Sequence, residues 1–287
     1  MIEHIITRKK LHEVDHQNPK LLGLTAVELN ITELCNRTCS FCPRSNPDIY
    51  PNKNLHMSIS TAQKIKQDLL DAKYKGLVHI CGFGEPLLHN NFLNLLSIFS
   101  KDFHLAVTTN GDRLLNGYYT PQDLQETGLS RLFVDSYDGE DQFKSFEELL
   151  VSYSSYYKIR KVFDTGSPLL TQQFMFNNRG GLISGQKNSN FKNPCYLPMY
   201  KILIDWNGDV ILCCNNWSRL KPHLGNINLE SLVNIWNSEK LCDVRKNLLK
   251  GQRQKYPACK NCNVKGTAIG AASADQWSDL LFNSQHS

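Results

Sequence analysis

The sequence predicts an α/β protein in which a partial (β/α)6 barrel precedes a small region of β-hairpin and helix. Short apolar, β-branched runs alternate with helical periodicity up to about residue 176, a pattern typical of parallel sheets. A polar segment then interrupts this alternation, and a hairpin sequence follows it. Six βα units in about 150 residues are too few to close an eightfold barrel, so we expect a partial one.

The six expected strands are rich in Val, Ile, Leu, Phe and Thr, which suit a half-buried pleated surface. In chain order they span residues 24–31, 77–81, 104–109, 131–135, 158–163 and 172–176.

Helices are expected between these strands. The segment 58–76 is expected to place Ile65, Leu69 and Leu70 on one face, with Ser58 or Ser60 as its N-cap. Further helices are expected at residues 91–99, 121–127 and 142–156.

The polar stretch 177–194 predicts a linker between two domains. Beyond it, Asn207 and Gly208 join two short strands, and one or two helices end at Gly251. We therefore expect the following parts: an extension (1–23), the barrel (24–176), the linker (177–194), a second domain (195–262) and a tail (263–287).

The composition points to a cytoplasmic protein without a nucleic-acid or membrane partner. The chain has 287 residues, of which 41% are hydrophobic, enough to bury a sizeable core. Its net charge of +5 is spread without a basic block. It has no apolar stretch long enough to span a bilayer, and its start lacks the apolar core of a signal peptide.

Ten cysteines are the informative part of the composition, because clustered thiols in a reducing cytosol favour metal binding over disulfides. Cys35, Cys39 and Cys42 lie in one short loop directly after the first strand. A structural zinc site would need a fourth protein ligand. A four-iron cluster on three cysteines would instead leave one iron open to a small molecule.

This CxxxCxxC spacing, with Phe41 before the last cysteine, resembles the motif of radical S-adenosylmethionine (SAM) enzymes. The ends of the next three strands add to the resemblance, since CGFGEPLLH is similar to the family's Gly-Gly-Glu segment with Phe83 in place of one glycine. The resemblance implies a radical SAM barrel and a [4Fe–4S] cluster whose open iron binds SAM. The residues implied to contact SAM are Phe41, Gly82, Gly84, Glu85, Asn110 and Ser136.

A second cysteine group offers enough thiols for a closed site. Its members are Cys195, Cys213, Cys259 and Cys262. Their spacing alone does not separate zinc from an iron–sulfur cluster. The whole segment resembles the twitch domain, a shortened SPASM domain, which implies one auxiliary [4Fe–4S] cluster.

Adjacent residues on a strand point in opposite directions, so only one of Cys213 and Cys214 is expected to bind a metal. The spacing from Gly208 favours Cys213. Cys214 is then either a small core residue or a thiol that returns a hydrogen atom to a substrate radical. Cys81 is expected to be a buried thiol of its strand.

The resemblance implies reductive cleavage of SAM, abstraction of a substrate hydrogen atom, and an electron donor of the flavodoxin or ferredoxin type. The favoured substrate is a sugar or aminocyclitol that is oxidised or epimerised, with Arg179 as its binding group. A peptide-modifying epimerase or crosslinking enzyme is one alternative. A non-catalytic metal-binding protein is the other.

Overall fold

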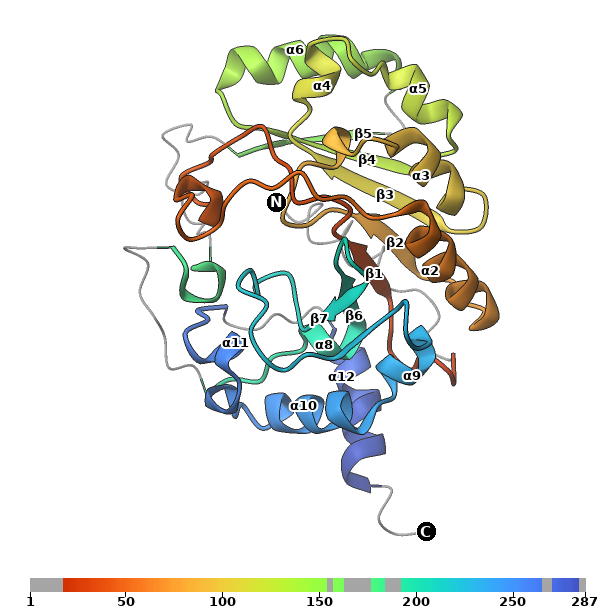
Figure 1. The fold of residues 1–287 in the computed structure, drawn as a ribbon, viewed down its shortest axis with the longest axis vertical. Helices are drawn as coiled ribbons and strands as arrows, with labels where there is room; N and C mark the ends of the chain where they lie inside the picture. Colours follow the sequence, from red (N-terminus) through yellow and green to blue (C-terminus); the bar gives the residue numbers. More distant parts are fainter. Residues whose placement is uncertain (1–17, 154–156, 163–176, 184–191, 265–269, 284–287) are drawn as a thin grey trace.

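The computed structural model describes residues 18–153, 157–162, 177–183, 192–264 and 270–283. Their strands form one sheet in the order β5-β4-β3-β2-β1-β6-β7-β8 (Figure 1). The strands are β1 (Ala26–Leu29), β2 (Leu77–Ile80), β3 (His104–Thr109), β4 (Arg131–Ser136), β5 (Tyr157–Lys161), β6 (Lys201–Ile204), β7 (Asp209–Ile211) and β8 (Gly225–Asn226).

The helices follow the same chain order. They are α2 (Ile59–Asp71), α3 (Phe92–Phe99), α4 (Asp112–Leu115), α5 (Pro121–Glu126), α6 (Glu140–Leu150), α8 (Leu197–Tyr200), α9 (Leu232–Trp236), α10 (Glu239–Leu249), α11 (Pro257–Lys260) and α12 (Ala271–Ser278). Single 3-10 turns lie at Pro43–Ser45, Pro86–Leu88, Val151–Tyr153, Arg179–Gly181 and Arg253–Lys255, and a π-helical turn at Asp279–Asn283 follows α12.

Five of the six expected barrel strands are confirmed as β1 to β5. Each pairs in parallel with the next, for example with Leu29 opposite Ile80 across β1 and β2. The sixth expected strand, 172–176, lies outside the described residues. The α/β class is therefore confirmed.

The N-cap expected for the first crossover helix is confirmed at Ser58, and α5 has a cap that was not predicted from the sequence. Ser58 is the N-cap of α2 and accepts a hydrogen bond from the Thr61 amide at 3.0 Å. Thr120 and Asp123 form a reciprocal capping box at the start of α5. These caps satisfy amides that the first turn of a helix leaves without partners.

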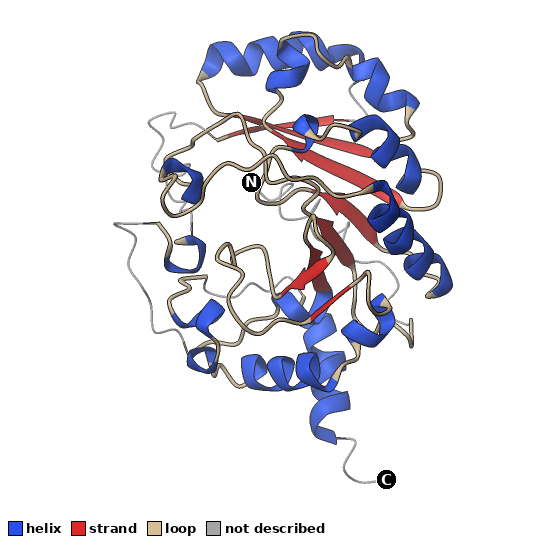
Figure 2. Ribbon diagram, viewed as in Figure 1, coloured by secondary structure: helices blue, strands red, loops and turns tan. Residues whose placement is uncertain are grey.

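The two faces of the sheet differ in chemistry. The helices α2, α3, α5 and α6 cover one face, and loops lie over the other (Figure 2). On the helix side, Val27 and Leu29 of β1 are fully buried in one core with Ile65 and Leu69 of α2. The opposite, inner face carries the polar side chains of Glu28 in β1 and of Asn30, which directly follows the strand.

The region beyond residue 195 continues the same sheet, which the sequence did not predict. Strand β6 pairs in parallel with β1, with Ala26 opposite Lys201, and places β1 between two neighbours. The expected hairpin of β6 and β7 is confirmed, and Gly208 supplies its turn with a φ of +87°. The domain boundaries at residues 177 and 195 stay predictions.

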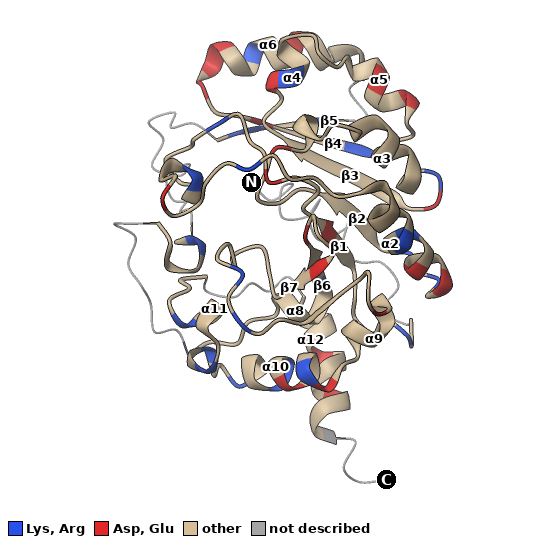
Figure 3. Cartoon of the chain, in the orientation of Figure 1, with Lys and Arg blue, Asp and Glu red and all other residues tan. Residues whose placement is uncertain are grey.

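Charged residues of both signs occur together on α2, α4, α6 and α10 (Figure 3). Among the described residues, no helix has the length and apolar character needed to cross a bilayer.

Candidate metal centres and the inner face of the sheet

The first cysteine group lies at the carboxyl end of β1, where the ends of parallel strands meet. Burial, with smaller contributions from Glu85 and the nearby Cys42 thiol, raises the pKa of Cys35 to about 11. Burial also raises the pKa of Cys39, and Cys42 again adds to the shift. The structure thus brings the three thiols together. A metal that binds them must displace their protons.

Arg37, inside this loop, fixes it to the ends of two other strands. Its guanidinium lies 2.6 Å from a carboxylate oxygen of Asp112, after β3, and 2.7 Å from one of Asp138, after β4. The guanidinium carbon of Arg37, Cζ, also lies 5.3 Å from the centroid of the Tyr137 ring. An open pocket of about 430 Å³ borders this loop and includes Cys39 in its lining.

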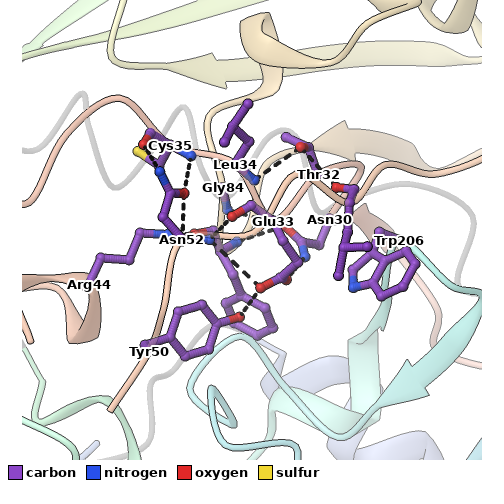
Figure 4. A network of polar contacts seen from close by, with 12 residues as sticks. Asn30, Thr32, Glu33, Leu34, Cys35, Arg44, Tyr50, Asn52, Gly84 and Trp206 are labelled. Atoms are coloured by element: carbon purple, nitrogen blue, oxygen red, sulfur yellow. Dashed lines mark hydrogen bonds and ion pairs between the residues drawn. The ribbon is translucent and has the colours of Figure 1, made fainter. Parts of the chain in front are cut away.

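The other side of the loop is fixed by a polar network (Figure 4). The Asn52 amide group donates to the carbonyl of Cys35 and accepts from its N–H, both at 2.9 Å. The buried Arg44 donates to Asn52 at 3.1 Å and to the Phe83 carbonyl at 2.8 Å. Asn52 therefore hydrogen-bonds both the N–H and the carbonyl group of Cys35.

The GFGE segment after β2 packs directly against this loop. A Cβ atom at Gly84 would lie 2.1 Å from the carbonyl oxygen of Thr32, so only glycine fits here. Glu85 is 3% exposed and accepts hydrogen bonds from Asn110, Thr109 and Leu87. Glu85 thus joins the ends of β2 and β3, in addition to its expected role toward SAM.

The other residues expected to contact SAM lie at the same edge of the sheet. Asn110 donates to Asn36 of the cysteine loop at 2.9 Å. The ring of Phe41 stacks on Tyr137 with centroids 5.8 Å apart. Ser136 is fully buried and its hydroxyl donates to Gln142 of α6 at 3.2 Å. The structure gathers these residues, and their contact with SAM stays a prediction.

The second cysteine group is also assembled. Burial raises the pKa of Cys213 well above its ordinary value, and neighbouring thiols raise it further. These thiols belong to Cys214, Cys259, Cys262 and Cys195. A donor set of four thiols can complete a tetrahedral zinc site or a four-iron cluster.

Arg253 fixes the chain at both ends of this group. Its guanidinium donates to the carbonyls of Asn193 and Pro194, before Cys195, and to that of Val264, after Cys262. No local sequence pattern indicates this role, because the three acceptors are main-chain oxygens.

Cys214 lies near charged groups of the inner face of the sheet, Glu28 and Lys201. Burial and the Glu28 carboxylate raise its pKa to about 11, against the lowering effect of Lys201 and Arg179. The ammonium of Lys201 lies 2.5 Å from one oxygen of Glu28. The other oxygen of Glu28 has no partner within the described part of the chain.

The rest of the inner face is polar as well. His79 hydrogen-bonds the hydroxyl of Thr108 at 2.9 Å, and Arg160 forms an ion pair with Asp135 at 2.5 Å. Cys81, expected as a buried strand thiol, offers its sulfur within 4.8 Å of ligand atoms of Glu28 and His79. This face suits a polar ligand better than an apolar one.

Arg179 lies between the two cysteine regions. Burial raises the pKa of both Cys42 and Cys214, and the positive charge of Arg179 opposes this shift in each case. Its φ is +50°, and its buried Nε has no hydrogen-bond partner among the described residues. An unsatisfied, buried guanidinium nitrogen is suited to bind a ligand oxygen.

Two family models match this chain. The model of the radical SAM superfamily matches residues 29–149, and that of the SPASM iron–sulfur cluster-binding domain matches residues 195–263.

Among curated proteins, the chain is similar to the S-adenosyl-L-methionine-dependent 2-deoxy-scyllo-inosamine dehydrogenase of Niallia circulans. The identity is 28% over 250 residues, which cover 85% of this chain and 94% of the relative. A GTP 3′,8-cyclase of Campylobacter jejuni is 32% identical over 112 residues, or 38% of this chain and 33% of the cyclase.

The fold is similar to that of BtrN in complex with AdoMet and 2-DOIA. The TM-score is 0.71 at 23% identity, covering 84% of this chain and 93% of BtrN. SuiB of Streptococcus suis bound to precursor peptide SuiA gives a TM-score of 0.50 at 13% identity, covering 94% of this chain and 76% of SuiB.

Proposed function

Because this chain contains a radical SAM domain and a SPASM iron–sulfur cluster-binding domain, we propose that it oxidises an alcohol of an aminocyclitol to a ketone. SAM and [4Fe–4S] clusters are the cofactors of these domains. The observation that carries the proposal is the buried Nε of Arg179, which has no hydrogen-bond partner among the described residues and lies near thiols of both cysteine regions. The similarity to an aminocyclitol dehydrogenase over nearly its whole length supports the same reaction.

In this proposal Cys35, Cys39 and Cys42 hold the cluster that binds SAM. The loop fits this role because it offers three thiols at a strand end whose neighbouring segments pack closely. When bound, SAM and this cluster would supply the radical that removes the carbon-bound hydrogen atom, the auxiliary cluster would accept one electron, and the hydroxyl proton would pass to a base. The residues proposed to surround SAM are Phe41, Gly82, Gly84, Glu85, Asn110 and Ser136.

The quartet Cys195, Cys213, Cys259 and Cys262 would hold the auxiliary cluster, since its donor set is complete. Arg179 would bind substrate oxygens between the two centres, and the inner face would exclude bulk water. An external donor of the flavodoxin or ferredoxin type would supply the electron that SAM cleavage requires.

The test is anaerobic turnover of iron–sulfur-loaded protein with SAM, a reductant and 2-deoxy-scyllo-inosamine. We expect one equivalent of ketone for each 5′-deoxyadenosine, measured by mass spectrometry. The variant Cys35→Ala should form neither product. SAM cleavage without any oxidised aminocyclitol would refute the proposed substrate.

Epimerisation is the second candidate, favoured by the protonated Cys214 thiol beside the inner face. Its raised pKa of about 11 keeps a hydrogen atom on sulfur at neutral pH. Turnover in D₂O separates the two reactions. An epimerase would incorporate deuterium at carbon and lose product in Cys214→Ala, whereas a dehydrogenase would do neither.

A further inference from the structure

Arg219, which follows Cys213 and Cys214 in the chain, reaches across to the first cysteine loop. Its guanidinium donates to Asp205 at 2.6 Å, to the Tyr50 hydroxyl at 2.6 Å and to a carboxylate oxygen of Glu33. Glu33 lies two residues before Cys35 in the chain. Arg219 therefore connects two segments that are 186 residues apart.

From Glu33 the contacts continue to the main chain of Cys35. Tyr50 donates to the second carboxylate oxygen of Glu33 at 2.8 Å. Arg44 donates to the Glu33 carbonyl and to Asn52, and Asn52 holds both polar main-chain groups of Cys35 (Figure 4). This series of hydrogen bonds leads from the C-terminal region to the first of the three thiols.

A second branch leads to the GFGE segment. Asn30 donates to Glu33 at 3.0 Å and to Asp205 at 2.6 Å, and its carbonyl oxygen accepts from the Phe83 amide at 2.8 Å. The Arg219 guanidinium also lies 5.0 Å from the Phe83 ring centroid. Two of the segments proposed to surround SAM, the cysteine loop and the GFGE segment, are thus connected to Arg219.

The charges of this network balance only when Arg219 is present. Glu33 and Asp205 are 4% and 1% exposed, and Asn30 bridges them. Arg219 contacts both carboxylates, whereas Arg44 forms its ion pair with Glu33 alone. Without Arg219, Asp205 loses its ion pair, and a buried unpaired charge forces its surroundings to rearrange.

We propose that Arg219 is a positioning residue through which the C-terminal region builds the SAM site. It does so by fixing the main chain at Cys35 and at Phe83 rather than by touching SAM. The inference rests on the proposed assignment of Cys35, Cys39 and Cys42 to the SAM-binding cluster. Mutation of residues that orient metal ligands in this way typically lowers metal affinity or activity roughly ten- to a hundredfold.

The test compares anaerobically loaded wild type with Arg219→Met, Arg219→Lys and the surface control Lys64→Met. Lys64 also forms an ion pair, with Asp68, but on an outer helix. SAM affinity is measured by equilibrium dialysis, and the SAM-induced change of the reduced cluster is followed by electron paramagnetic resonance.

We expect Arg219→Met to bind SAM roughly tenfold more weakly and to lose iron from the first site, with the auxiliary cluster unchanged. Arg219→Lys should recover part of the affinity, and Lys64→Met should match wild type. Equal SAM affinity in Arg219→Met and wild type would overturn the inference.

If Arg219→Met does not fold, Tyr50→Phe replaces it, because it removes one hydroxyl from the same network. A roughly threefold loss of SAM affinity would support the inference, and no loss would overturn it. Failure of the proposed function would give a different result from failure of this inference, because wild type would then bind SAM and still oxidise no aminocyclitol.

Discussion

At the scale of single residues, the most unusual environment is that of Arg245 in α10. Its side chain is fully buried between two indoles, 4.0 Å from the ring centroid of Trp236 and 3.6 Å from that of Trp277. It donates to the carbonyls of Pro198 and Trp236. Burial lowers its pKa to about 9. Cation–π contacts and carbonyl dipoles therefore replace the usual carboxylate partner.

Replacing Arg245 by alanine should destabilise the protein by about 3–5 kcal/mol, because it opens a cavity between the indoles and leaves two buried carbonyls without donors. Denaturant unfolding measures this loss. Arg245→Met is the matched control, since it refills the volume and should lose less. A change below about 1 kcal/mol in Arg245→Ala would contradict the structural role.

The carboxyl group of Glu85 should make stability depend on pH. Burial outweighs the lowering effect of three hydrogen-bond donors and raises its pKa to about 7. A proton therefore binds the folded state more tightly than the unfolded state. Stability is highest below the ordinary carboxyl pKa and falls as pH rises through about 7, by about 3 kcal/mol in total.

Urea unfolding of the cluster-free protein between pH 5 and 8 measures this dependence. Glu85→Gln should be less stable than wild type at pH 5, because the NH₂ group of the new side chain would face one of the groups that donate to Glu85. It should also lack the decline between pH 5 and 8. Parallel curves for the two proteins would show that another group titrates.

The thiols of the two centres could be predicted from the sequence, because ligand spacing is a local property that a motif preserves. Arg37 and Arg219 could not. Their partners lie 75 and 186 residues away, and many other arginines have the same local sequence character. Long-range ion pairs depend on the finished fold, which no short pattern encodes.

At the scale of elements, apolar runs and caps located β1 to β5 and α2 within a few residues. The apolar residues of these elements recur with the period of a strand or a helix, and this pattern can be read directly from the sequence. The pairing of β6 with β1 was not predictable in the same way. Register between distant strands follows from which faces the finished sheet buries.

The close packing of two strand-end segments gives an element-scale prediction. Gly84→Ala should displace the first cysteine loop, because its Cβ would meet two backbone oxygens, at 2.1 and 2.8 Å. We expect loss of iron from the first site and of SAM binding. Iron analysis and visible absorption measure both.

Gly117→Ala is the matched control. Gly117 has a positive φ of +71°, but a Cβ atom there would meet no other part of the described chain within 4 Å. The substitution should cost roughly 1 kcal/mol of stability and leave the iron content unchanged. Normal iron in Gly84→Ala would contradict the steric argument.

At the scale of the whole molecule, one sheet joins the regions that contain the two cysteine groups. Strand β1 lies between β2 and β6, so it has no exposed edge in the complete chain. A protein ended at residue 194 would lack β6 and so expose that edge of β1.

We therefore expect the truncated protein to aggregate rather than to form a smaller folded enzyme. Size-exclusion chromatography and circular dichroism measure this, with the full chain as the control. A soluble, folded monomer that still binds SAM would contradict the expectation.

The central place of β1 also has a consequence for the order of events during synthesis. The ribosome makes its two neighbours, β2 and β6, at very different times, because the residues that pair with Ala26 are Leu77 and Lys201. At roughly 5–20 residues per second, the ribosome needs about six to twenty-five seconds to make the chain between Leu77 and Lys201. Throughout this interval a nascent barrel has an open edge, so we expect it to depend on chaperones. Insertion of iron should then be a post-translational event.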